Sequence, residues 1–181
     1  AGKEPLTLVE ASVMPALAEV GDGFERRTLF LPQLLQSAAA AQAAFDLIRA
    51  ALPPRAARED RRVVLATVQG DVHDIGKNIV KVMLMNYGFS VTDLGKDVPP
   101  QRVVEAARDT GAPLVGLSAL MTTTVPAMAQ TIRLLRRELP QVRVVVGGAV
   151  LTEAYAREIG ADFYARDAMA TVRVAQEVLG A

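Results

Sequence analysis

The only histidine of the chain, His73, stands between two aspartates, Asp71 and Asp74. Three roles are open to it. It could cap a loop, it could act as a general base oriented by Asp71, or it could bind a metal while Asp71 holds its other ring nitrogen. A general base needs a nucleophile, and the sequence contains no cysteine and no G-x-S-x-G motif. One protein ligand suits a metal that brings its own equatorial ligands.

Two further segments gather groups that are suited to binding. The segment 118–124 holds Ser118 and three consecutive threonines without a charged residue, and Gly147-Gly148 follows another apolar run. Hydroxyls can donate to or accept from a ligand, and adjacent glycines let a bulky ligand approach the backbone. The structural alternatives are a helix cap before Pro126 for the threonines and a tight turn for the glycines.

From Arg61 onward, short β-branched runs alternate with helical stretches, which predicts repeated βα units and a parallel sheet. The predicted strands are 63–68, 89–93, 114–117, 142–146 and 162–165. The predicted helices are 77–86, 101–109, 125–138, 152–158 and 168–179. This is an α/β fold with a five-stranded doubly wound parallel sheet. Ligands bind beyond the carboxyl ends of such strands, where all three segments above are found.

The first part of the chain predicts helices only. Leu6, Val9, Val13, Leu17 and Val20 recur at intervals of three and four, and an Ala- and Leu-rich stretch runs over 29–52 until Pro53-Pro54. The prolines and charges of 53–60 then read as a linker. We therefore expect a helical subdomain over 1–57 and the α/β domain over 58–181.

Composition limits the function further. The 181 residues carry 20 basic and 20 acidic side chains and no cysteine. A net charge of zero with scattered arginines argues against a nucleic acid or a membrane as partner, and no apolar run approaches the roughly 20 residues that span a bilayer. A cytoplasmic location is expected by default. Disulfides, Fe-S clusters and sites that need two imidazoles are excluded.

At these positions the chain resembles cobalamin-binding proteins that hold their cofactor base-off with a histidine ligand. Their fingerprint is D-x-H-x-x-G, then S-x-L, then G-G. Here it reads Asp71 to Gly76, then Ser118-Ala119-Leu120 after 41 residues, then Gly147-Gly148 after 26 more. The segments Val20 to Phe24 and Leu29 to Gln33 resemble the helical cap that precedes this Rossmann-like, flavodoxin-like domain in cobalamin-dependent methionine synthase.

The resemblance implies a role for each matching position. His73 is expected to bind cobalt, as the only metal ligand from the protein, with Asp71 and Thr124 forming a relay that takes up a proton when His73 is released. The other implied contacts to the cofactor come from the loops at the sheet edge and from the cap. They are Gly70, Val72, Asp74, Gly76, Ser118, Leu120, Thr122, Gly147, Gly148, Ala168, Glu10, Phe24 and Leu31. For Phe24 and Leu31, helix-pair packing is the structural alternative.

The implied function is a methyl carrier that uses methylcobalamin. As a module of methionine synthase, it would move a methyl group from methyltetrahydrofolate to homocysteine, with the folate, homocysteine and activation domains of the same enzyme as partners. The alternative is a stand-alone corrinoid protein of a methanol or methylamine methyltransferase system. A cobalamin photoreceptor or regulator and an adenosylcobalamin mutase subunit share the fingerprint. A full cap has four helices, so the chain is expected to hold a partial bundle.

Overall fold

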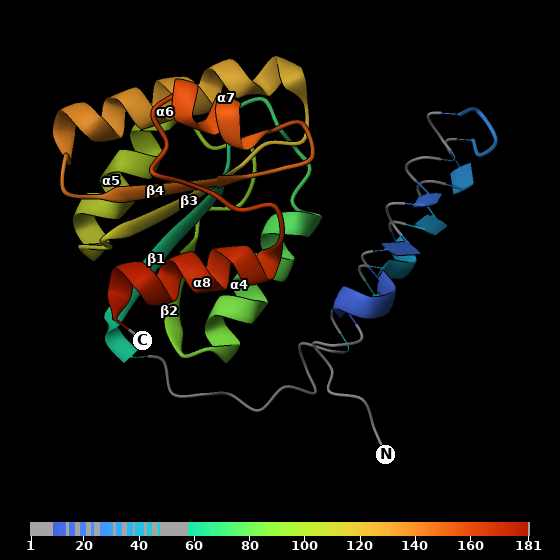
Figure 1. Ribbon diagram of the computed structural model, residues 1–181, viewed down its shortest axis with the longest axis horizontal. Coiled ribbons are helices and arrows are strands. Elements are labelled where there is room, and N and C mark those ends of the chain that lie inside the picture. The colour runs from blue at the N-terminus through green and yellow to red at the C-terminus, as the bar shows by residue number, and fades with distance from the viewer. Residues whose placement is uncertain are drawn as a thin grey trace. The chain divides into compact units, whose positions relative to one another are not determined.

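The computed structural model describes residues 9–13, 15–16, 19–20, 23, 26–30, 32–33, 36–37, 39–41, 43–44, 47 and 58–180. The chain divides into two compact units, Ala1–Pro54 and Arg55–Ala181. Each is described by itself, and Figure 1 shows the elements of both.

The first unit contains helical residues before and after one turn. It contains a short π-helix, η1 (Val9–Val13), and all described residues over 15–23 and 32–47 are helical. Between them, the Gly23 carbonyl accepts hydrogen bonds from the N–H groups of Thr28 and Leu29, at 2.9 and 3.0 Å. The helical character predicted for the two stretches is therefore present at the described residues of 9–23 and 32–47.

The second unit is a five-stranded parallel sheet in the order β2-β1-β3-β4-β5 (Figure 1). Its strands are β1 (Arg58–Thr67), β2 (Phe89–Asp93), β3 (Leu114–Ser118), β4 (Arg143–Gly147) and β5 (Phe163–Tyr164). Its α-helices are α4 (Ile75–Asn86), α5 (Pro100–Thr110), α6 (Val125–Glu138), α7 (Glu153–Glu158) and α8 (Ala168–Leu179). A single 3-10 turn, η2 (Thr122–Thr124), precedes α6. The five-stranded doubly wound prediction is confirmed.

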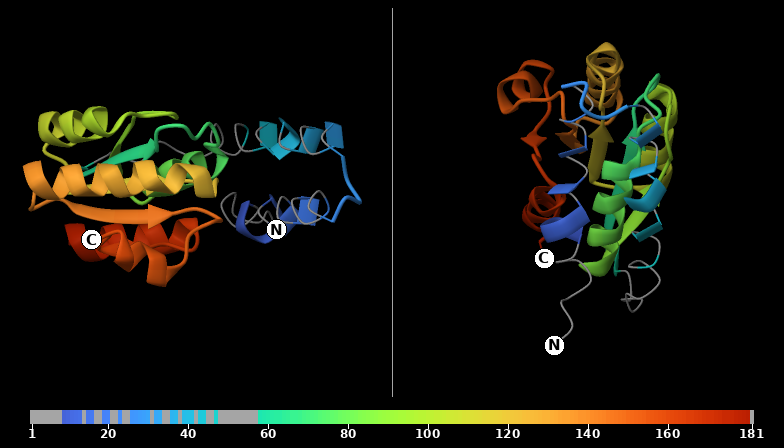
Figure 2. Two further views of the ribbon diagram at one scale, coloured as in Figure 1. Left: turned by 90° about the horizontal axis from the view of Figure 1, so that it is seen from above. Right: turned by 90° about the vertical axis from the view of Figure 1, so that its right-hand side faces the viewer.

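Helices cover both faces of the sheet. Helices α4 and α8 pack together on one face, and α5, α6 and α7 lie on the other (Figures 1 and 2). The helix after β1 and the helix after β3 therefore leave on opposite faces, which puts the topological switch point between these two neighbouring strands. In open α/β sheets this is where ligands bind.

The central strands are buried on both faces, which explains their unbroken apolar runs. Val63, Val64 and Val144 have no exposed surface. One cluster joins alternate residues of β1, β3 and β4 to apolar side chains of α5 and α6, including Val103 and Ile132. This packing fixes the sheet edge at which the strands deliver their loops.

The structure differs from the prediction mainly at the start of β1. This strand begins at Arg58, whereas the charged segment 53–60 reads as linker in the sequence. Its pairing with β2 shifts register between Arg58 and Arg62, so the early part follows an irregular ladder. Strand pairing therefore overrides a local composition that disfavours strands.

No helix in the described parts of the chain has the length and apolar character to cross a membrane.

Candidate functional site

The loop between β1 and α4 carries Asp71 and His73. It turns back at Gly70, whose φ of +84° favours glycine, and the Asp71 N–H donates to the Val68 carbonyl at 3.0 Å. Asp74 follows as the N-cap residue of α4, and its side chain makes no capping hydrogen bond. The loop lies at the carboxyl end of β1, on the switch-point side of the sheet.

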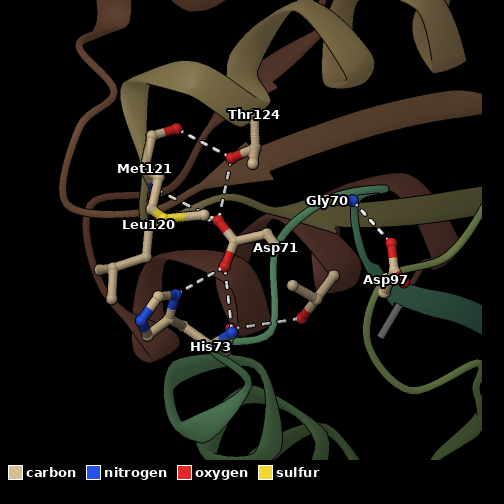
Figure 3. Close-up of polar contacts among 8 residues, drawn as sticks. Gly70, Asp71, His73, Asp97, Leu120, Met121 and Thr124 are labelled. Carbon is tan, nitrogen blue, oxygen red and sulfur yellow. Dashed lines mark hydrogen bonds and ion pairs between the residues drawn. The ribbon is translucent and has the colours of Figure 1, made fainter.

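Asp71 holds His73 by two contacts, one to the imidazole and one to the backbone (Figure 3). Asp71 Oδ1 lies 2.8 Å from His73 Nδ1 and accepts the His73 backbone N–H at 3.0 Å. The Asp71 side chain is fully buried, whereas that of His73 is 46% exposed. A carboxylate can only accept, so Nδ1 carries the proton and Nε2 presents a lone pair. Within the described residues, Nε2 has no hydrogen-bond partner.

The second oxygen of Asp71 is fixed by the loop after β3. Asp71 Oδ2 accepts the N–H groups of Leu120 and Met121, at 2.7 and 3.2 Å, and the Thr124 hydroxyl at 2.9 Å. Burial alone would raise the pKa of Asp71, but the hydrogen bonds from His73, Leu120 and Thr124 outweigh it and lower the pKa to about 2. The switch point therefore holds a buried, ionised carboxylate that orients one imidazole.

The surroundings of His73 leave room for a large ligand. Val72 and Leu120, which are 56% and 42% exposed, are apolar side chains beside the histidine and its carboxylate. A Cβ placed on Gly76, in the first turn of α4, would meet no atom within 4 Å. The described residues contain no group of three or more His, Cys, Asp or Glu that could hold a metal ion. The donor set therefore suits a metal complex that supplies its own equatorial ligands, not a bare ion.

The sheet register brings two other predicted residues together. Ser118 pairs with Thr67 of β1 on one side and with Gly147 of β4 on the other. Their carbonyls hold the loops that follow, because Val68 N–H donates to Ser118 at 3.0 Å and Ala119 N–H donates to Gly147 at 3.2 Å. Ser118 and Gly147 thus share one row at the carboxyl edge with the strand that leads to His73.

The glycine pair has a reason within the chain itself. A Cβ on Gly148 would lie 1.8 Å from the Ala119 carbonyl oxygen, and Gly148 has a φ of +142°. A Cβ on Gly147 would lie 3.1 Å from the Ala165 carbonyl oxygen. Close backbone packing therefore requires glycine at 148 with or without a ligand. A contact of either glycine with the cofactor stays a prediction.

The remaining predicted residues make no hydrogen bond to Asp71 or His73, or lie outside the described residues. Thr122 is exposed in η2, and Ala168 is half-buried at the start of α8, where Asp167 caps the Ala170 N–H at 2.7 Å. Phe24, Leu31 and the side chain of Glu10 lie outside the described residues.

Sequence reasoning missed two sets of contacts to this loop. One is the pair of backbone N–H groups at Leu120 and Met121, for which no side-chain pattern exists. The other is Asp97, whose carboxylate accepts the Gly70 N–H at 2.7 Å (Figure 3). The available signal for Asp97 was its place just after a parallel strand, on the same sheet edge as His73.

Comparison with known proteins gives two family matches and several similar proteins. The family model described as "B12 binding domain" matches residues 61–173, and a second model with the same description matches residues 1–49. Dimethylamine corrinoid protein 1 of Methanosarcina acetivorans is 43% identical over 179 residues, which cover 97% of this chain and 84% of that relative. The monomethylamine corrinoid protein of Methanosarcina barkeri superposes with a TM-score of 0.88 at 32% identity, covering 98% and 85% of the two chains.

A more distant likeness is to a chain in the methanol:cobalamin methyltransferase complex of Methanosarcina barkeri. The TM-score is 0.65 at 27% identity, with 99% of this chain and 69% of that chain covered.

These findings correct the expected partners. The aligned region makes up 84% of the dimethylamine relative, which leaves no room in that protein for folate, homocysteine and activation domains. The prediction that such domains of one methionine synthase are the partners is wrong, and the names of the relatives agree better with the alternative of a stand-alone corrinoid protein. What the fingerprint, the fold and both family matches have in common is the cofactor, and the chain belongs to the B12-binding family, with a Rossmann-like B12 binding domain at 61–173.

Proposed function

We propose that this chain is a corrinoid-binding methyl carrier of a methylamine methyltransferase system, and that His73 is the lower ligand of the cobalt. One observation carries the proposal. Nδ1 of His73 is bound to the buried carboxylate of Asp71 at 2.8 Å, and Nε2 is left with a lone pair on a half-exposed imidazole. A metal-binding histidine typically has its other nitrogen held in this way.

The chain's own residues position the ligand. When bound, the corrinoid supplies a cobalt that accepts and gives up a methyl group. Asp71 keeps the proton of His73 on Nδ1, which directs Nε2 to the metal and raises its basicity. Thr124 and the two N–H groups of the β3 loop fix Asp71 in turn. We propose that Asp71 and Thr124 form with His73 the relay that would take up a proton when His73 is not bound to the metal.

The rest of the proposed site lies along the carboxyl edge of the sheet. We propose that Gly70, Val72, Asp74 and Leu120, on the two loops of the switch point, and Gly76, in the first turn of α4, contact the corrin. The row of Ser118 and Gly147, with Gly148, Thr122 and Ala168 beyond it, is proposed to take the displaced nucleotide tail of the cofactor. We also propose that residues 1–57 supply contacts to the cofactor through Glu10, Phe24 and Leu31.

The similarity of the relatives favours methylamines over methanol as the source of the methyl group. The dimethylamine and monomethylamine corrinoid proteins match at 43% and 32% identity, while the chain from the methanol complex matches at 27%. The partner would then be a separate methyltransferase. This choice can be tested by single-turnover methylation of the corrinoid-loaded chain, using purified methyltransferases specific for each methylamine and for methanol. Transfer from methanol alone would contradict it.

Ligation by His73 is tested by absorption spectra of the chain with methylcobalamin. We expect His73→Ala to retain the corrinoid, lose the spectrum of the histidine-bound form, and regain it when imidazole is added. Imidazole rescue separates a lost ligand from a misfolded chain, and circular dichroism of the unloaded variant checks the fold. A His73→Ala spectrum identical to that of the unaltered protein would exclude ligation.

A further inference from the structure

The segment after β2 runs along the His73 loop beyond the formal end of the strand. The Leu94 N–H donates to Leu65 at 2.9 Å, and the Val98 N–H donates to Thr67 at 3.1 Å. Val68 and Val98 form an isolated parallel bridge. The backbone of 94–98 is therefore held against the end of β1, directly before the residues that turn toward His73.

Asp97 contacts two consecutive residues of the turn, Gly70 and Asp71. Its carboxylate Oδ1 accepts the Gly70 N–H at 2.7 Å, and its own N–H donates to the Asp71 carbonyl at 2.9 Å. Figure 3 shows Asp97 reaching Gly70 from the opposite side of the loop to His73. We infer that Asp97 is a positioning residue that sets where Asp71, and through it His73, is presented to the metal. This rests on the proposed role of His73 as ligand.

The backbone of Asp97 indicates that the carboxylate is needed there. Its φ is +54°, in the left-handed region where non-glycine residues are uncommon and where aspartate and asparagine are tolerated best. Glycine would adopt this conformation more easily but has no acceptor for the Gly70 N–H. A strained conformation persists where its surroundings hold it, and here five hydrogen bonds join 94–98 to β1 and the loop after it.

A second contact ties the same segment to helix α4. The carboxylate of Asp93 binds Lys77 Nζ at 2.5 Å and accepts the Gly95 N–H at 3.0 Å, and Lys77 is buried in the first turns of α4. The chain on both sides of His73 is thus anchored to the segment 93–97. Before His73, Asp97 contacts Gly70 and Asp71; after it, Asp93 contacts Lys77. Loss of the Asp97 carboxylate frees the Gly70 N–H, whereas the backbone bond to Asp71 and the contact of Asp93 with Lys77 remain.

Three substitutions separate the acceptor from the backbone strain. Asp97→Ala and Asp97→Gly both remove the acceptor, and only the glycine variant relieves the positive φ. Asp97→Asn keeps an oxygen that can accept the Gly70 N–H. Without cofactor, we expect hydrogen exchange of the Gly70 amide to accelerate about tenfold in the alanine and glycine variants, the size expected for one lost hydrogen bond, and little in the asparagine variant.

With cofactor, the readout is ligation of His73. The nitrogen splitting in the electron paramagnetic resonance spectrum of the cobalt(II) form reports the histidine ligand. From the fraction with His73 bound, we calculate the equilibrium constant for ligation of the cobalt by His73. We expect this constant to be about tenfold lower in Asp97→Ala and Asp97→Gly, and to be restored in Asp97→Asn. A merely destabilising change would not shift this equilibrium or be rescued by asparagine.

The control is Asp162→Ala. Asp162 accepts the Val144 N–H at 2.7 Å, as Asp97 accepts that of Gly70, but at the amino ends of the strands. We expect this variant to lose stability with unchanged His73 ligation. Normal ligation and unchanged Gly70 exchange in both acceptor-free Asp97 variants would overturn the role of Asp97. A wild-type spectrum that does not depend on His73 would instead overturn the proposed function.

Discussion

Asp71 shows how a buried charge can be stabilised without a cation. A carboxylate removed from water must have its lone pairs satisfied, and Asp71 receives five hydrogen bonds from two loops. Only one of these comes from a hydroxyl. The Thr124 hydroxyl also lies 2.8 Å from the Met121 carbonyl oxygen, so two acceptors compete for its single proton. The charged Asp71 carboxylate is the stronger acceptor of the two.

The Thr124 contact can be tested by a nearly isosteric change. We expect Thr124→Val to lower the free energy of unfolding by about 2 kcal/mol, because Asp71 loses a hydrogen bond to a charged group. Thr124→Ser keeps the hydroxyl and should cost about 1 kcal/mol or less, the value of one methyl group. Urea unfolding of both variants measures this. Equal losses for valine and serine would show that the hydroxyl contributes nothing.

Two glycines near the site are predicted to respond in opposite ways. Gly76 lies in the first turn of α4 with open space where a Cβ would be. We expect Gly76→Ala to keep or raise stability by up to about 1 kcal/mol, since alanine favours helix. If the corrinoid occupies that space, affinity falls about tenfold or more through crowding. Corrinoid titration with and without the substitution decides; unchanged affinity would place the ligand elsewhere.

Gly148→Ala provides the contrast, since its Cβ would collide with the Ala119 carbonyl oxygen. The backbone must move to relieve this clash and the positive φ, and we expect a loss of at least about 2 kcal/mol in unfolding free energy even without ligand. Thermal unfolding of the unloaded protein measures the loss. A stable Gly148→Ala variant would contradict the close backbone packing of this turn.

At the scale of elements, Asp162 ties helix α6 to two strands. It binds Arg136 of α6, Arg143 of β4 at 2.8 Å and the Val144 N–H at 2.7 Å. Burial would raise the pKa of Asp162, but the hydrogen bonds from Arg136, Val144 and Arg143 outweigh it and lower the pKa below its ordinary value of 3.8. These contacts lie at the amino edge, away from the proposed ligand.

This shift predicts an acid dependence of stability. A carboxyl whose pKa is lower when folded stabilises the fold above its unfolded pKa, and this contribution disappears as pH falls through the folded pKa. We therefore expect unfolding free energy to decline below about pH 4, and Asp162→Asn to remove part of that decline. Urea unfolding at a series of pH values measures it. Identical slopes for both proteins would contradict the assignment to Asp162.

Most elements could be predicted from the sequence because their signals are local. The boundaries of α6 and α8 agree to the residue, since apolar periodicity and Pro126 mark them. The early part of β1 could not be predicted, because Arg58 to Arg62 join the strand through pairing with β2 and not through apolar character. Asp97 was missed for the same reason, because its carboxylate contacts the Gly70 N–H, 27 residues away in sequence.

For the whole molecule, the sequence was more informative about the cofactor than about the reaction. The fingerprint of Asp71, His73, Ser118 and Gly147 marks a way of holding cobalamin that several classes of protein share. Nothing in these residues distinguishes methionine synthase from a methylamine corrinoid protein. Similarity along the full chain favours the methylamine corrinoid proteins, because it compares residues throughout the chain and not the fingerprint alone.

Binding of the corrinoid should stabilise the chain by mass action. At a free concentration about 100 times the dissociation constant, we expect unfolding free energy to rise by about 2.7 kcal/mol. His73→Ala should need more corrinoid for the same gain. Chemical unfolding at graded corrinoid concentrations, in the dark, tests this for the intact chain. Stability that does not change with concentration would mean that the folded chain does not bind the cofactor preferentially.

The two main-chain donors to Asp71 have a consequence for redesign. Any residue but proline offers the same N–H, so the side chains at 120 and 121 can vary while the carboxylate keeps these partners. Leu120 is 42% exposed beside the histidine. A substitution at position 120 should therefore change the surface beside His73 and leave the N–H contact that fixes Asp71 in place.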